Sequence, residues 1–201
     1  MVINALGREF SDQKVIVACF YFEFAAQKEQ SPKNMLGSLL KQIVRGFPEI
    51  PGEVVKEYYK LKKVIGGRRP QLSEIQTMLQ TVSASQRVFI CVDALDECAA
   101  EHRQVVLKSL REILEKSPST RLFLTGRSYI RGEVESLFVE TVTFMDIKLN
   151  KCDINTYILA MLEEDTNKSA MSLSLQTDIL TKVPAMVSGM CVRAETLGYP
   201  P

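Results

Sequence analysis

The stretch Arg87-Val-Phe-Ile-Cys-Val-Asp93-Ala-Leu-Asp96-Glu97-Cys98 decides the fold more than any other part of the chain. It begins with a charged residue, continues through five apolar residues, and ends in three carboxylates within five positions. An unbroken apolar run indicates a strand buried on both faces, as in the parallel sheet of an α/β protein. Because α/β proteins bind ligands at the carboxyl ends of such strands, the acids mark a candidate site.

Other apolar runs predict further strands, and segments with helical spacing separate them. The predicted strands cover residues 15–24, 88–92, 122–125 and, more weakly, 142–147. Helical stripes occur over 34–47, where Ser31 before Pro32 is a plausible entry signal, and over 72–82 and 106–114. Strands joined by helical crossovers predict an α/β layer fold with a parallel sheet.

Two regions depart from this alternation. Residues 48–70 contain three prolines, the Gly66-Gly67 pair and a lysine-rich stretch, which indicate a surface connection containing a short helix. After Asn150 the pattern is only helical, with Asp153 as the predicted cap. We therefore place a boundary there, between a first domain over 1–150 and a helical segment over 151–201.

Composition narrows the class of protein and of partner. With 201 residues, 46% of them hydrophobic and 24% charged, the chain suits a soluble globular protein. A net charge of +1 gives no electrostatic reason to expect nucleic acid or a membrane as a partner. The five cysteines form no Cys-x-x-Cys pair, so we expect them to be reduced, and the chain to be cytoplasmic.

The acids after the second strand suit metal-assisted phosphoryl transfer. Asp93, at the strand end, would hold Mg²⁺ directly or through a water, since this ion takes oxygen ligands and keeps several waters. Asp96 or Glu97, further on, would polarise the attacking water. The alternative is a strand that ends in a solvated acidic turn, and a phosphatase or metal hydrolase built on Asp93 and Asp96 alone finds little other support.

The third strand also runs into polar residues, in Arg121-Leu-Phe-Leu-Thr125-Gly126-Arg127. Thr125 would hydrogen-bond the catalytic water or a phosphate oxygen, and Arg127 would neutralise charge on the transferred group. The alternative is that Arg127 solvates the strand end or pairs with acids of the neighbouring strand.

Together these motifs resemble the NACHT domain of nephrocystin-type signalling proteins. These are STAND-class P-loop NTPases, abundant in filamentous fungi and often joined to ankyrin repeats. VFICVDALDEC resembles the family's Walker B strand, and RLFLTGR resembles its first sensor, where the family usually has Ser at the position of Gly126. The stretch ACFYFEFAAQKEQSPKNMLGSLLKQIV resembles the strand and helix after the phosphate loop, and Ser188–Ala194 a small helical module that follows.

The resemblance implies a P-loop NTPase-like three-layer sandwich from which the first strand and the phosphate loop are missing. A phosphate loop requires G-x-x-x-x-G-K-[ST], and the sequence contains no Gly-Lys dipeptide. Residues Val2–Phe10 resemble the helix just downstream of that loop. In the family's sheet order, the first strand belongs between the strands at 122–125 and 142–147, so we expect a gap there with two unpaired edges.

The resemblance further implies a nucleotide-dependent molecular switch that uses Mg²⁺ and ATP or GTP. Without the loop lysine, we expect this chain to bind no nucleotide tightly and to hydrolyse none by itself. Two alternatives remain open: an interaction fragment that self-associates or binds NACHT relatives, and a truncated gene product without function.

Overall fold

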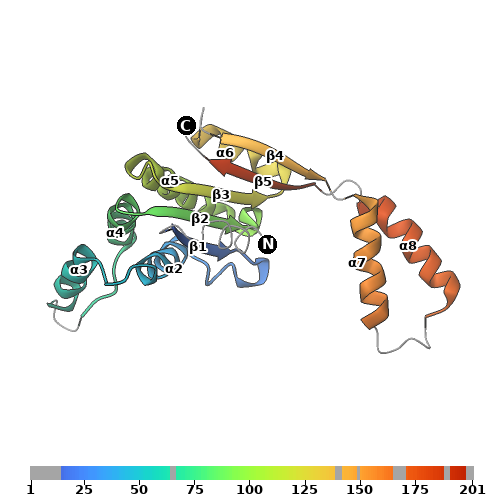
Figure 1. The fold of residues 1–201 in the computed structure, drawn as a ribbon, viewed down its shortest axis with the longest axis horizontal. Coiled ribbons are helices and arrows are strands. Elements are labelled where there is room, and N and C mark those ends of the chain that lie inside the picture. The colour runs from blue at the N-terminus through green and yellow to red at the C-terminus, as the bar shows by residue number, and fades with distance from the viewer. Residues whose placement is uncertain are drawn as a thin grey trace. The chain divides into compact units, whose positions relative to one another are not determined.

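The computed structural model describes residues 15–63, 67–138, 142–148, 150–164, 171–187 and 191–197. Within them, α-helices and β-strands alternate through the first half of the chain (Figure 1). The strands are β1 (Val15–Tyr21), β2 (Arg87–Asp93), β3 (Arg121–Gly126), β4 (Val142–Lys148) and β5 (Cys191–Leu197). The α-helices are α2 (Pro32–Arg45), α3 (Gly52–Lys63), α4 (Leu72–Ala84), α5 (Ala100–Lys116), α6 (Arg131–Leu137), α7 (Lys151–Glu164) and α8 (Leu173–Val187). The helix predicted over Val2–Phe10 lies outside the described residues.

The mixed α/β class and the parallel pairing of the first three strands are confirmed. β1 pairs with β2 in parallel, and β2 pairs with β3 in parallel. The apolar run of β2 is buried from Val88 to Val92, as expected for a strand covered on both faces. The carboxyl ends of these strands therefore meet at one edge of the sheet, where Asp93 and Thr125 lie.

The main core lies between one face of the sheet and the helices α2, α4, α5 and α6. It includes Ile16 and Ala18 of β1, Ile90 of β2, and fully buried leucines from α2 and α5. The opposite face carries a smaller cluster around Phe89 and Cys91, packed by Val15, Val17, Cys19 and Phe123. The helices α2, α4, α5 and α6 thus form one layer on the sheet. The third layer of the expected sandwich stays a prediction.

Sequence signals set the ends of several helices. The Ser31 hydroxyl accepts a hydrogen bond from the backbone N–H of Asn34 at 3.3 Å, so the predicted entry signal of α2 is confirmed. The short helix expected within 48–70 is α3, of which only Leu61 is buried. The predicted cap of α7 is wrong: Asn150 Oδ1 accepts the N–H of Asp153 at 2.8 Å, because Asp153 already lies inside the first helical turn.

The first strand is shorter than predicted. The apolar run continues to Phe24, but β1 ends at Tyr21. There the Gln30 side chain takes over the backbone pairing: its amide donates to Tyr21 O at 2.8 Å and its oxygen accepts from Glu23 N at 2.8 Å. Phe24 begins a 3₁₀ turn, η1 (Phe24–Ala26), and its side chain is 74% exposed.

The expected gap between the third and fourth strands is not present in the structure. The order of the sheet is β1-β2-β3-β5-β4, so β5 occupies the position that we expected to be empty. Figure 1 shows β5 running opposite to β3 and β4. The chain fills this position because unpaired backbone groups of two facing edges are satisfied by any strand that reaches them. Residues 191–194, expected to belong to a helical module, are therefore strand.

Contacts divide the chain into two compact units, one of residues 1–145 and 194–201 and one of residues 146–193. In the second unit, α7 and α8 pack against each other (Figure 1). The proposed boundary at residue 150, and the identity of the following segment as a helical module, stay predictions. Among the described residues, no helix combines the length and the apolar character that a bilayer crossing requires.

Candidate functional site

The carboxyl ends of β2 and β3 bring Asp93 and Thr125 together. The strand register pairs Val92 with Leu124, which makes the next two residues neighbours. Thr125 Oγ1 donates a hydrogen bond to Asp93 Oδ1 and accepts one from the backbone N–H of Ala94 at 3.0 Å. Asp93 is exposed at the end of an otherwise buried strand. The hydroxyl thus orients a carboxylate that solvent and ligands can reach.

The chain turns sharply after Asp93 through a strained residue. Ala94 has φ 52° and ψ 46°, which is the left-handed region. This conformation costs a residue with a side chain roughly 1–2 kcal/mol. The following residues form the 3₁₀ turn η2 (Leu95–Glu97), in which Leu95 is fully buried. The turn places Asp96 and Glu97 beside the strand end instead of beyond it.

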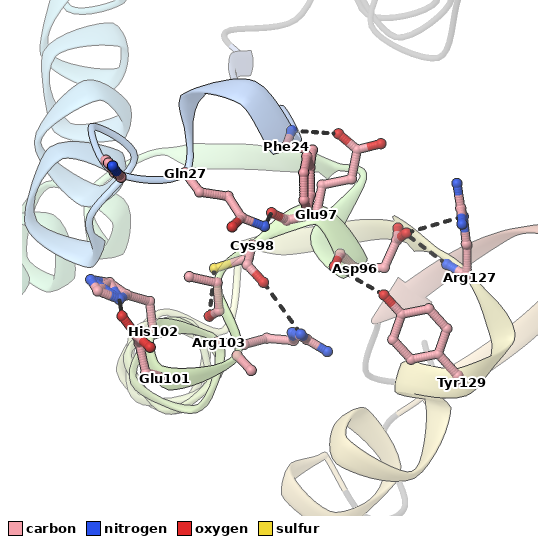
Figure 2. A pocket seen from close by; sticks show the side chains of 13 residues that line it. Phe24, Gln27, Asp96, Glu97, Cys98, Glu101, His102, Arg103, Arg127 and Tyr129 are labelled. Carbon is pink, nitrogen blue, oxygen red and sulfur yellow. Dashed lines mark hydrogen bonds and ion pairs between the residues drawn. The ribbon is translucent and has the colours of Figure 1, made fainter.

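Asp96 is held by the segment that follows β3. Its side chain is only 7% exposed, and its Oδ2 lies 3.4 Å from Nε of Arg127. The Arg127 backbone N–H donates to Asp96 Oδ1 at 3.3 Å, and the Tyr129 hydroxyl donates to the Asp96 carbonyl at 3.1 Å (Figure 2). Arg127 therefore pairs with an acid that follows the neighbouring strand, which was part of the alternative to its predicted role in charge neutralisation. Its side chain remains 63% exposed.

Glu97 binds a different part of the chain. Its Oε2 accepts the backbone N–H of Phe24 at 2.9 Å, and its carbonyl accepts from Nε2 of Gln27 at 2.7 Å. Figure 2 shows these two contacts on the side of the loop away from Arg127. The carboxylate of Glu97 thus holds η1 against the acidic turn, and only Asp96 of the two acids faces the cation.

A buried arginine contacts the end of the acidic turn. Arg103 of α5 is 6% exposed, lies 3.0 Å from Glu133 of α6, and donates to the Cys98 carbonyl at 3.3 Å. Burial raises the pKa of the Cys98 thiol to about 11, although the positive charge of Arg103 acts in the opposite direction. Cys98 is also only 2% exposed, so it packs in the core.

Several of these residues line a pocket of about 710 Å³ (Figure 2). Asp96, Glu97, Arg127 and Tyr129 line one part of it, and the remainder comes from Phe24, Gln27, Lys28 and residues 98–103. Asp93 and Thr125 are not among the lining residues, so they lie beside the pocket. The lining carries three cationic side chains, Lys28, Arg103 and Arg127, and as many carboxylates. Lys28 and Arg127, with the exposed rings of Phe24 and Tyr129, suit a ligand with anionic and planar parts.

Asp93, whose carboxylate Thr125 orients, is the residue that fits Mg²⁺. The described residues contain no group of three or more His, Cys, Asp or Glu side chains that would hold a metal ion by itself. Mg²⁺ needs no such cage, because proteins often hold it by one or two carboxylates together with waters and substrate phosphates. One exposed carboxylate whose orientation is fixed by a hydroxyl satisfies that requirement.

Sequence reasoning missed most of the residues that line the pocket, among them Phe24, Gln27, Lys28 and Tyr129. The first three follow the end of β1, which the apolar run had placed further along the chain. Tyr129 lies in a 3₁₀ turn, η3 (Ser128–Ile130), which leaves no periodic pattern. The position of these residues in the chain could have predicted them, because the segments after β1 and β3 follow strands that flank β2 in a parallel sheet.

Fold and site together define an α/β protein with an acidic site at the carboxyl ends of parallel strands. The model of the family described as nephrocystin 3, N-terminal, matches residues 1–127. This match covers more than half of the chain, and the chain belongs to this family. A comparison with curated proteins gives no match.

Proposed function

We propose that this chain carries the Walker B and first-sensor part of a NACHT-type nucleotide switch with a P-loop NTPase-like fold. The observation that carries the proposal is the pairing of polar side chains across the ends of β2 and β3: Thr125 with Asp93, and Arg127 with Asp96. The strained Ala94 between the two acids adds support, because such strain concentrates at functional sites.

In this proposal, Asp93 holds Mg²⁺ directly or through a water, and Thr125 orients its carboxylate. The ion would neutralise charge on the phosphate oxygens when it is bound. Asp93 is suited to be the metal ligand because it is exposed and its carboxylate is already oriented. ATP or GTP would lie toward the pocket beside it, where Lys28 and Arg127 offer positive charge. The proposal does not decide whether the pocket prefers adenine or guanine.

Arg127 and Asp96 form the switching pair of this proposal. In the structure, the guanidinium neutralises a carboxylate that is almost fully buried. A phosphate that binds Arg127 exchanges one ion pair for another and releases Asp96 as a base for water. Glu97 is the other candidate base, but its carboxylate already accepts the Phe24 N–H, so Asp96 is the stronger one.

We expect this chain to bind Mg²⁺-nucleotide weakly and not to hydrolyse it by itself. Its sequence contains no Gly-Lys dipeptide, so the lysine and backbone cradle that stabilise the transferred phosphate are not supplied by these residues. A clear NTPase activity that Asp93→Ala abolishes would contradict this part of the proposal.

Titration of the purified chain with fluorescent ATP and GTP analogues, with and without Mg²⁺, tests the binding. Asp93→Asn should weaken the magnesium-dependent part of binding, because the metal loses its charged ligand. Asp96→Asn should strengthen binding, because it frees Arg127 for phosphate. Asp153→Asn, an exposed substitution on α7, is the matched control. If Asp93→Asn and Asp96→Asn both bind like the parent chain, as the control should, the site is assigned wrongly.

A second candidate function is association with NACHT relatives or with a second copy, without catalysis. The observation that favours it is the exposed apolar surface of α7 and α8, where Tyr157 is 66%, Leu173 81% and Met186 82% exposed. Leu173→Asp with Met186→Asp should abolish co-purification with an intact relative, whereas Ser174→Asp should not. A monodisperse monomer that captures no relative would count against it.

A further inference from the structure

A second pocket, of about 550 Å³, lies between α2, α3 and α4. It shares no lining residue with the pocket at the acidic turn. Its volume falls within the roughly 300–1,000 Å³ typical of small-molecule sites. Three helices form it, and α3 contributes through a face on which only Leu61 is buried. A ligand between α3 and its neighbours would therefore cover apolar surface that the described part of the chain leaves open.

The floor of this pocket is apolar. Leu40 of α2, Val54 and Leu61 of α3, and Met78 of α4 line it. Their side chains carry no hydrogen-bonding group apart from the weakly accepting sulfur of methionine. A bound extended peptide would bring N–H and C=O groups that these side chains cannot pair, at a cost in free energy. The floor thus favours a hydrocarbon chain over an extended peptide.

The rim of the pocket is cationic. Lys62, Arg68 and Arg69 line it, and no carboxylate is among the described lining residues. Arg68 is held by both oxygens of Glu74. Arg69 is exposed and makes no hydrogen bond or ion pair with a residue that the structure describes. Lys62 lies 5.9 Å from the centre of the Tyr58 ring, which weakly attracts its charge. Two positive charges are therefore available to a ligand.

We propose that this pocket binds an aliphatic carboxylate, with its hydrocarbon chain between α2, α3 and α4 and its carboxylate at Lys62 and Arg69. Charge complementarity selects the acid over an alcohol or an amine of the same chain length, because the rim offers only cations. Such a ligand would join α3 to the rest of the α/β unit. This inference is independent of the proposed nucleotide site.

Calorimetric titration with decanoate, below its micellar concentration, tests the proposal directly. Decanol and decyltrimethylammonium are the neutral and cationic comparators. The parent chain should bind decanoate, bind decanol more weakly, and not bind the ammonium compound. Equal binding of all three would reduce the site to a nonspecific apolar surface and overturn the proposal, and so would a failure of decanoate to bind.

Variants locate the binding. Lys62→Glu with Arg69→Glu should weaken decanoate binding about tenfold, as expected when two partly exposed charges are reversed. Lys63→Glu with Lys108→Glu makes the same change in net charge away from the lining, and should leave the affinity unchanged. Equal losses in the two double variants would show that only net charge matters, and would overturn the assignment of the rim.

A fluorescent reporter in the pocket measures binding without any change of charge. The sequence contains no tryptophan, so Tyr58→Trp places a single indole at the pocket. Decanoate should shift its emission to shorter wavelength, because the hydrocarbon chain displaces water from the ring. Val54→Trp should instead fill the pocket and abolish binding while circular dichroism shows an unchanged helix content. Undiminished binding by a folded Val54→Trp chain would place the ligand elsewhere.

Discussion

Gln42 of α2 closes the outer edge of the sheet through its side-chain amide. β1 is the first strand in the sheet order, so one side of its backbone has no partner among the described strands. Gln42 Oε1 accepts the N–H of Cys19 at 2.9 Å, and Gln42 Nε2 donates to the Cys19 carbonyl at 2.8 Å. A single side chain thus pairs both backbone groups of an edge residue, in the way that a neighbouring strand would.

Replacing Gln42 by leucine should lower the free energy of unfolding by about 1–3 kcal/mol. The change keeps the size of the side chain but leaves a partly buried N–H and a carbonyl unpaired, which carries a cost of that order. Urea denaturation followed by circular dichroism measures it. Gln104→Leu, at an exposed position on α5, should stay within about 0.5 kcal/mol of the parent chain. Equal effects would show that the amide does not stabilise the edge.

Gly126 has a packing reason to be glycine. A Cβ atom built there would lie 2.6 Å from Cδ1 of Ile130, which is 4% exposed, and 3.4 Å from Oδ1 of Asp96. The family that the motif resembles usually has serine at this position. In this chain the isoleucine of the following turn occupies the space that a serine side chain would need.

Gly126→Ala and Gly126→Ser should each destabilise the chain by about 1–2 kcal/mol, since overpacking forces the Ile130 side chain to move. Ile130→Val removes Cδ1, the atom that would clash. The double variant Gly126→Ala with Ile130→Val should therefore be more stable than the sum of the two single changes, by about 0.5–1 kcal/mol. Thermal denaturation of all four chains measures the coupling. Strict additivity would place the clash elsewhere.

The residue types predicted which residues belong to the site better than they predicted which residues these would contact. Asp93, Asp96, Thr125 and Arg127 come together because adjacent parallel strands end at the same edge of a sheet. The partner of Glu97 was not predictable, because its contact with Phe24 depends on where β1 ends, and the apolar run continues past that point. The roles proposed for these residues in catalysis stay predictions.

At the scale of single elements, α4 begins with a reciprocal capping box. The Gln71 side chain and the backbone of the first turn pair with each other, and Glu74 accepts the Gln71 N–H at 2.7 Å. Glu74 also binds Arg68 through both oxygens. Hydrogen bonds from the Arg68 guanidinium, followed by the one from the Gln71 backbone, lower the pKa of Glu74 from 4.5 to about 2.

Stability should therefore depend on pH through Glu74. Its folded-state pKa lies below the unfolded value, so its contribution is complete above about 4.5 and is lost as the pH falls toward about 2. The effect is small, because Arg68 and Glu74 are partly exposed. Glu74→Gln should lower Tm near neutral pH, and the difference from the parent chain should vanish in acid. Glu163→Gln on α7 controls for the loss of one charge, and a difference that does not change with pH would contradict the prediction.

Elements with strong periodicity were predictable, and those that depend on side-chain contacts were not. β2 and β3 extend only one residue beyond each end of their predicted ranges, and α4 begins at its predicted residue, Leu72. These segments bury regular apolar patterns, which the sequence displays directly. By contrast, the three 3₁₀ turns carry no period. The start of α7 depends on Asn150 rather than on the acid that the pattern suggested.

At the scale of the whole molecule, the order of the strands was the part least visible in the sequence. Sequence patterns predicted which segments form the first four strands, but not that β5 lies between β3 and β4. Cys191–Leu197 is short, and it follows a helical pair that suggests more helix. Pairing between segments distant in sequence depends on which edges are left open, and no local pattern records that.

The position of β5 makes the end of the chain important for the whole sheet. A chain that ends at Met190 lacks this strand and leaves one edge of β3 and one edge of β4 without a partner. It should unfold at lower urea concentration than the full chain. It should also self-associate more as its concentration rises, because exposed edges pair between molecules. A chain that ends at Leu197 keeps the strand and should behave like the parent chain. Light scattering during size exclusion, at several concentrations, measures association, and urea denaturation measures stability. If both truncated chains remain monomers of parental stability, β5 does not hold the sheet together.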